Sequence, residues 1–252
     1  MSSPSALYNG NMDDLRSTWS QRAWTLAVSA GILASLTTSA FLAASSGSFT
    51  SLAGAACAAF AAYSFADLAT GFYHWAIDNY GDATTPLLGA QIKAFQGHHR
   101  HPYTIVRREL CNNLHVAARA VAVVLPAADA ALYAAGVPVA AHVFVDVLAA
   151  CLVLSQQFHV WAHEKPRRLP RPVAALQAAG VFLSREHHAE HHRPPYDTNY
   201  CIISGMWNGV LDGFKVFRGL EEVIYLCTGI RPRSWDTPDA KWREHGIDDA
   251  GN

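Results

Sequence analysis

The chain has 252 residues, of which 51% are hydrophobic and 15% are charged, and its formal net charge at pH 7 is −1. This composition is too apolar for an ordinary soluble domain, so we expect one integral membrane domain. The near-zero net charge and the absence of a long lysine- and arginine-rich run argue against nucleic-acid binding. Five scattered cysteines without a CxxC pair indicate neither a disulfide framework nor a thiolate metal site.

The first 23 residues are polar and acidic near Asp13 and lack the basic start and apolar core of a secretory signal. We interpret residues 1–23 as an N-terminal extension, compatible with the remnant of a plastid transit peptide. Residues 24–235 then form the membrane domain and residues 236–252 a polar C-terminal tail.

Four apolar stretches each have about the 20 residues that a helix needs to cross a hydrocarbon core of about 30 Å. They cover residues 24–44, 52–75, 116–135 and 139–161. Short turns rich in serine, glycine and proline join the first stretch to the second and the third to the fourth. The predicted fold class is therefore all-α, with four transmembrane helices in two hairpins and a histidine-rich cap.

The positions of lysine and arginine predict the topology, because neither hairpin turn contains one. By the positive-inside rule, both termini, the loop 76–115 and the tail from residue 162 lie on one face of the membrane. In a plastid this face would be stromal.

Eight histidines lie at the ends of the second and fourth apolar stretches or in the segments that follow them. They are His74, His98, His99, His159, His163, His188, His191 and His192. The topology, which depends only on the apolar stretches and on lysine and arginine, brings all eight to the same membrane face. A neutral imidazole is a good ligand for iron or zinc but a poor residue to bury unpaired, so the sequence predicts a metal centre there.

The spacing of these histidines supports a shared site. His159 and His163 are four apart, which puts both rings on one helix face. The run from His187 to His192 has four histidines in six residues, and a helix would present several of them on one side. The adjacent pair His98 and His99 is expected in a loop after an amphipathic segment.

Other polar residues are candidates for orienting these ligands. Asp67 and Asp78 share the helix face of His74, and a carboxylate beside a ligating histidine fixes its tautomer. Asp78 is alternatively a ligand, and Asp67 alternatively a polar contact between helices. Further candidates near the centre are His101, Asn112, Asn113, His115 and His187.

The number of ligands narrows the choice of metal. One zinc ion takes three or four protein ligands, so eight imidazoles suit two ions. The paired Glu and Glu-x-x-His motifs of carboxylate-bridged di-iron bundles are absent. An all-nitrogen donor set is compatible with non-haem iron that activates dioxygen, and haem with two histidine ligands is the competing interpretation.

Several spaced motifs between residues 64 and 235 resemble the Kua-type lipid desaturases. They are Phe72-Tyr-His74-Trp-Ala-Ile-Asp78, Gln96-Gly-His98-His99, Gln156-Gln-Phe-His159-Val-Trp-Ala-His163, and His188-Ala-Glu-His191-His192 with the later Asn199-Tyr-Cys-Ile. This family includes plasmanylethanolamine desaturases and a plastid desaturase of palmitate on phosphatidylglycerol. The stretches Asn112-Asn113-Leu-His115 and Arg231-Pro-Arg-Ser-Trp235 are more similar to the plastid branch.

The resemblance implies two non-haem iron ions held by the eight histidines, and an O2-dependent desaturase that forms a trans Δ3 double bond in palmitate of phosphatidylglycerol. It also implies ferredoxin as electron donor and a thylakoid or envelope membrane of the chloroplast, with the endoplasmic reticulum as the alternative. Two other functions remain open at this point. One is a related desaturase or hydroxylase on another lipid, including vinyl-ether formation, and the other is a non-catalytic membrane metal-binding protein.

Overall fold

The computed structural model describes residues 15–236, and all regular structure in this part of the chain is helical. Four long helices dominate it: α1 (Trp19–Ser45), α2 (Phe49–Asn79), α5 (Leu110–Ala134) and α6 (Val139–His163). They confirm the four predicted transmembrane helices, although each of the four is longer than predicted. The predicted N-terminal extension and C-terminal tail lie mostly outside the described residues.

Local sequence signals account for the ends of these helices. Thr18 and Gln21 form a capping box at the start of α1, in which each side chain satisfies the backbone N–H of the other residue. Gly47 in the first hairpin turn and Gly136 in the second both have φ of +61°, a conformation that glycine adopts without strain. Pro138 then precedes α6. These turns produce the two predicted antiparallel hairpins.

Helix α6 lies at the centre of the bundle and packs against α1, α2 and α5. Small residues allow the close approach of α2 and α6, since Ala62 and Ala66 are fully buried. A cluster of aliphatic side chains fills the space between α1, α5 and α6; it consists of Val28, Ile32, Ala118, Val121, Leu125, Ala149 and Val153. The bundle therefore has a tightly packed interior that fixes the relative positions of its ends.

The outer surface of the bundle is apolar. Leu26, Phe41 and Val123 are 67%, 69% and 75% exposed, and many similar side chains surround them on the long helices. A surface this apolar is stable only against lipid, because a soluble protein rarely exposes patches of such size. All four long helices are also long and apolar enough to cross a membrane.

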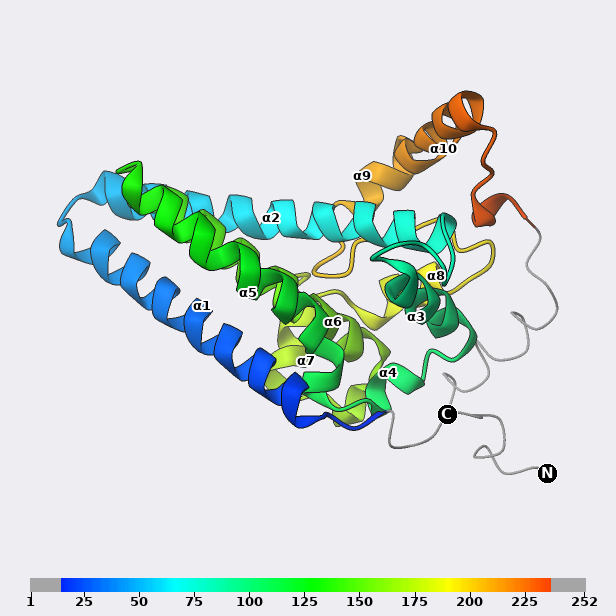
Figure 1. Ribbon diagram of the computed structural model, residues 1–252, viewed down its shortest axis with the longest axis horizontal. Helices are drawn as coiled ribbons and strands as arrows, with labels where there is room; N and C mark the ends of the chain where they lie inside the picture. The colour runs from blue at the N-terminus through cyan, green and yellow to red at the C-terminus, as the bar shows by residue number, and fades with distance from the viewer. Residues whose placement is uncertain (1–14, 237–252) are drawn as a thin grey trace.

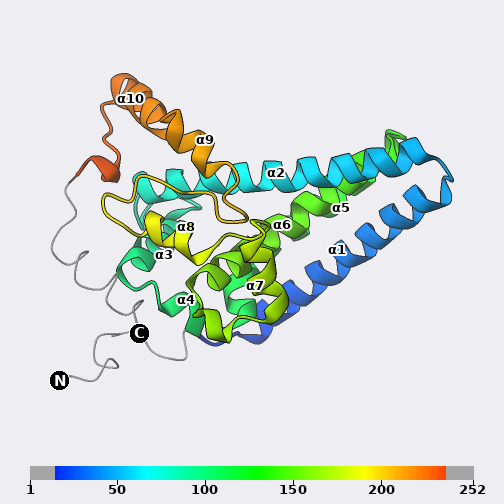
Figure 2. The same cartoon turned by 180° about the vertical axis from the view of Figure 1, so that it is seen from behind.

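The shorter helices gather at one end of the bundle, opposite the two hairpin turns (Figures 1 and 2). They are α3 (Gly89–Arg100), α4 (Thr104–Arg107), η3 (Pro166–Arg168), α7 (Arg171–Ala178), α8 (Arg185–His191), α9 (Asn208–Gly213), α10 (Val216–Thr228) and η4 (Arg233–Trp235). Together they form the predicted cap on one face.

One detail of the cap differs from the sequence-based expectations. His98 and His99 do not lie in a loop, because α3 continues to Arg100. This difference matters for the site, since a helix fixes the directions of neighbouring side chains more strictly than a loop does.

Helix α2 has 31 residues and is about 46 Å long at 1.5 Å per residue. This exceeds the hydrocarbon core of about 30 Å. Its last turns, which carry His74 and Asp78, therefore extend into the cap.

Candidate metal centre

The cap brings together the side chains of all eight predicted histidine ligands and of Asp78. Their ligand atoms form two groups, and within each group all atoms lie within 4.8 Å of one another. The five-histidine group consists of His98, His159, His163, His188 and His192. The Asp78 group consists of His74, Asp78, His99 and His191.

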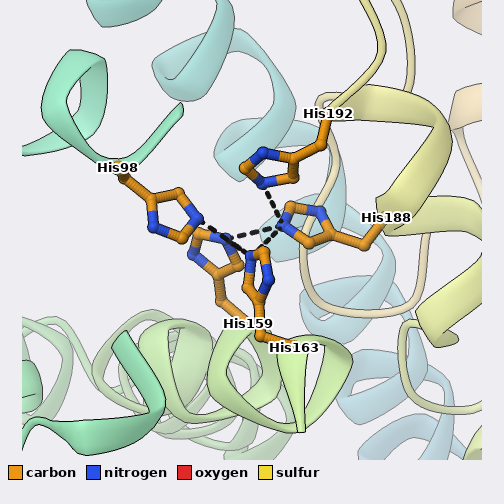
Figure 3. Close-up of side chains that lie close together, drawn as sticks. All are labelled: His98, His159, His163, His188 and His192. Atoms are coloured by element: carbon orange, nitrogen blue, oxygen red, sulfur yellow. Dashed lines mark hydrogen bonds between the residues drawn. The ribbon is translucent and has the colours of Figure 1, made fainter. Parts of the chain in front are cut away.

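In the five-histidine group, the imidazoles from α3, α6 and the end of α8 point at one another (Figure 3). The Nε2 atom of His188 lies 2.8 Å from that of His159, 2.7 Å from that of His163 and 3.1 Å from that of His192. The Nε2 atom of His98 lies 2.9 Å from that of His163. Five ring nitrogens thus converge on one small volume.

This convergence fits a bound cation. A neutral imidazole has a single N–H, so its other nitrogen presents a lone pair. Five Nε2 atoms at such distances cannot all pair as donor and acceptor with one another, and the remaining lone pairs repel each other. A metal ion removes this conflict, because it accepts all of the lone pairs at once.

The Asp78 group is built around one carboxylate oxygen. Asp78 Oδ2 lies 3.2 Å from His74 Nε2, 3.0 Å from His99 Nε2 and 3.5 Å from His191 Nε2. All four side chains are buried. Three imidazole nitrogens and a carboxylate are a donor set that iron accepts.

Helical geometry explains how the adjacent histidines are shared between the two groups. Successive residues on a helix point about 100° apart, whereas residues four apart share a face. His188 and His192 accordingly enter the five-histidine group, while His191 enters the Asp78 group. In the same way, His98 enters the five-histidine group and its neighbour His99 enters the Asp78 group.

Hydrogen bonds outside the groups orient two of the ligands. The Nδ1 of His74 lies 3.0 Å from the carbonyl oxygen of Tyr200, and the Nδ1 of His191 lies 2.8 Å from that of Thr198. Since a carbonyl only accepts, each Nδ1 donates and each Nε2 keeps its lone pair for a metal. Among the described residues, the Nδ1 atoms of His159, His188 and His192 in the five-histidine group have no such carbonyl partner.

Arg185 joins α8 to the end of α6. Its Nη1 donates to the carbonyl oxygen of His163 at 2.9 Å and to that of Glu164 at 3.3 Å. Ser184 caps α8 by accepting from the backbone N–H of His187. These contacts bring His188 opposite the histidines of α6.

Burial favours the neutral form of four imidazoles of the cap, those of His98, His188, His191 and His192. Burial, followed by neighbouring histidines, lowers the pKa values of His98, His188 and His192 well below the usual value. For His191, burial and then the neighbouring His74 lower the pKa to about 4, against the opposing effect of Asp78. A neutral imidazole is the form that binds metal, so these side chains are ready to ligate at neutral pH.

The same shifts predict that acid destabilises the metal-free protein. Histidines in the unfolded chain take up protons below about pH 6.5, whereas the folded chain resists protonation down to lower pH, to about 4 for His191. Stability is therefore complete above pH 6.5 and falls as the pH drops from there towards 4. We expect a lower Tm at pH 5.0 than at pH 7.5 in detergent, and equal values would contradict this assignment of neutral histidines.

The remaining predicted site residues lie outside both groups. The side chain of His187 is exposed, and the ring of His101 contacts Tyr103. The amides of Asn112 and Asn113 donate to the carbonyl oxygens of Arg16 and Ile105, and His115 Nδ1 lies 2.8 Å from the carbonyl oxygen of Asn112. Asp67 bonds to backbone N–H groups of residues 203–205 rather than to His74.

Two contributions to the site were not predicted. The carbonyl groups of Thr198 and Tyr200 belong to the backbone, which side-chain motifs do not reveal. Arg233 donates to the carbonyl oxygen of Asp78 at 3.1 Å, and the backbone N–H of Ser234 donates to Asn79 Oδ1 at 3.0 Å. The only sequence signal for either segment was its resemblance to the motifs of lipid desaturases.

The chain matches the lipid desaturase domain over residues 63–235, which contain every member of both groups. It is 48% identical to fatty acid desaturase 4, chloroplastic, of Arabidopsis thaliana, with 90% of this chain and 68% of the relative covered. It is 44% identical to fatty acid desaturase 4-like 1, chloroplastic, of the same plant, over 94% of this chain and 78% of the relative.

A more distant relative is plasmanylethanolamine desaturase 1 of Mus musculus, which is 31% identical over 71% of this chain and 67% of its own length. No solved structure matches the chain significantly. The four apolar helices and the chloroplast relatives identify an integral membrane protein of the chloroplast. The chain belongs to the lipid desaturase family, and it is an oxidoreductase.

Proposed function

We propose that each of the two groups binds one iron ion and that the enzyme uses dioxygen to remove two hydrogens from an acyl chain of a membrane phospholipid. The observation that carries this proposal is the presence of two adjacent groups of buried metal-binding atoms at one face of a membrane bundle. In this proposal the ligands are the eight histidines and Asp78, whereas His187, His101, Asn112, Asn113 and His115 are not ligands.

The chemistry that bound iron would supply is the reduction of dioxygen: forming one double bond consumes one O2, two electrons and two protons and releases two waters. The chain itself supplies position and environment. Packing around the buried imidazoles excludes water from the centre. The carbonyls of Thr198 and Tyr200 and the Arg185 guanidinium hold the ligand-bearing segments in place.

The location of the centre suits a lipid substrate. His74 and His163 lie near the ends of membrane helices, so the centre adjoins the membrane that holds the acyl chains. Holding one methylene at a fixed distance from the oxidant is the main contribution that a protein makes to such a reaction.

We further propose palmitate of phosphatidylglycerol as the substrate, a trans Δ3 double bond as the product and ferredoxin as the electron donor. The support is the 48% identity to a chloroplast fatty acid desaturase, together with the motif resemblance. The distribution of lysine and arginine, read by the positive-inside rule, supports a position of the centre on the stromal side of a thylakoid or envelope membrane.

Lipid analysis of a host that makes this protein, with a ferredoxin and its reductase, tests the substrate assignment. We expect a new trans Δ3 hexadecenoyl chain in phosphatidylglycerol and unchanged chains in the other phospholipids. New vinyl-ether lipids instead would assign the activity of the plasmanylethanolamine desaturases, which the mouse relative favours. Unchanged acyl and alkyl profiles with an iron-loaded enzyme would contradict both assignments.

A further inference from the structure

The segment from Thr198 to Asn208, which joins α8 to α9, is held closely against α2 in the cap (Figure 2). It supplies the two carbonyl groups that face the Nδ1 atoms of His191 and His74. The position of this segment therefore sets the direction in which two of the three imidazoles of the Asp78 group, His74 and His191, point. We call it the orienting segment.

Asp67 fixes the orienting segment to α2. It is fully buried, and its Oδ1 accepts the backbone N–H groups of Ile203, Ser204 and Gly205 at 3.1, 2.8 and 3.1 Å. Its Oδ2 accepts the N–H of Trp207 at 3.4 Å. A buried carboxylate is costly unless fully bonded, and here four backbone donors satisfy it without any histidine.

Close contact and further hydrogen bonds also fix the orienting segment to α2 one helical turn after Asp67, towards the C-terminal end of the helix. A Cβ atom at Gly71 would lie 2.4 Å from the Sγ of Cys201, so glycine alone allows this approach without a shift. Thr70 Oγ1 accepts the N–H of Ile202 at 3.3 Å. Asn208 binds both backbone groups of Cys201, accepting at 2.8 Å and donating at 3.3 Å.

We propose that Asp67 and Gly71 are positioning residues for the Asp78 group and act through the orienting segment. They hold the carbonyls of Tyr200 and Thr198 where these fix the tautomer and ring orientation of His74 and His191. The five-histidine group receives no hydrogen bond from this segment, so the effect is confined to one of the two metal positions. This inference rests on the proposed metal-binding role of the Asp78 group.

The Asp67→Asn variant tests whether the negative charge of Asp67 is needed to hold the orienting segment in place. Asp146→Asn is the matched control, because Asp146 is also fully buried in a membrane helix but bonds to Ser39 of α1, in the bundle away from the cap. Metal-free protein in detergent is titrated with Fe(II), and Co(II) spectra report the geometry of each position. We expect the affinity of one position to fall 10- to 100-fold in Asp67→Asn, with altered Co(II) bands, and no change at either position in the control.

Substitutions at the two residues in close contact, Gly71 and Cys201, test the same inference without removing a charge. Gly71→Ala should displace the orienting segment and weaken the same position, Cys201→Ala alone should have little effect, and the double variant should recover wild-type binding. The recovery shows that the contact with the Cys201 sulfur causes the effect, and confinement of the weakening to one metal position separates positioning from a general loss of stability.

Wild-type affinity and spectra in both Asp67→Asn and Gly71→Ala, or equal weakening of both positions without rescue, would overturn the inference. These outcomes are distinct from failure of the proposed function. In that case the wild-type protein itself would not bind two ions.

Discussion

Replacing His188 with alanine is expected to abolish desaturation and to remove the ion from the five-histidine group. The Nε2 of His188 lies within 3.1 Å of those of three other members, so it occupies the middle of the group. Loss of a residue that only orients a ligand costs 10- to 100-fold, and loss of a ligand should cost more than about 100-fold. The measurement is the amount of desaturated product per unit of protein, with iron quantified in the purified variant.

His187→Ala is the matched control for this experiment. His187 precedes His188 on the same helix, but its side chain is exposed and belongs to neither group. We expect iron content and product to remain at wild-type levels. If His188→Ala kept its iron and its activity, or if both variants lost them equally, the assignment of His188 would be wrong.

Replacing Asp78 with asparagine is expected to reduce the iron content from two ions to one and to lower the activity by more than about 100-fold. Asparagine preserves the shape of the side chain but removes the negative charge that Oδ2 presents to three imidazoles at 3.0 to 3.5 Å. The remaining ion should stay in the five-histidine group, which contains no acid. Iron analysis and O2 uptake with a reductant measure the two effects.

Asp82→Asn provides the control, since Asp82 is an exposed acid just beyond the end of α2 that bonds to Thr84. The Asp82→Asn variant should bind two iron ions and retain the wild-type activity. An Asp78→Asn variant that still bound two ions with unchanged affinity would show that Asp78 is not a ligand.

The bundle and its sidedness could be predicted because they depend on properties that a sequence displays directly. Twenty apolar residues identify a membrane helix, and the absence of lysine and arginine from the turns identifies the side. The set of histidines in the two groups could be predicted from this topology, because it brings His74, His163 and His188 to one face of the membrane. The predicted end of α2 at residue 75 is too early, because Asp78 and Asn79 interrupt the apolar pattern, yet they remain helical within the cap.

The division of the histidines into two groups could not be predicted. His98 and His99 were expected in a loop, where neighbouring rings can share one ion, and only the helix α3 separates them. The role of Asp67 in holding the orienting segment could not be predicted from the sequence either. It shares a helix face with His74, but two turns of helix separate them and the orienting segment, distant in sequence, bonds to the carboxylate.

The metal content of the purified enzyme shows whether the two groups hold a pair of iron ions. Enzyme made with ⁵⁷Fe should contain two iron ions per chain, and its Mössbauer spectrum should show two components of equal area. They should differ because one position has only imidazole ligands and the other includes the carboxylate of Asp78. A single iron per chain, or tightly held zinc without iron, would show that the two groups do not hold a pair of iron ions.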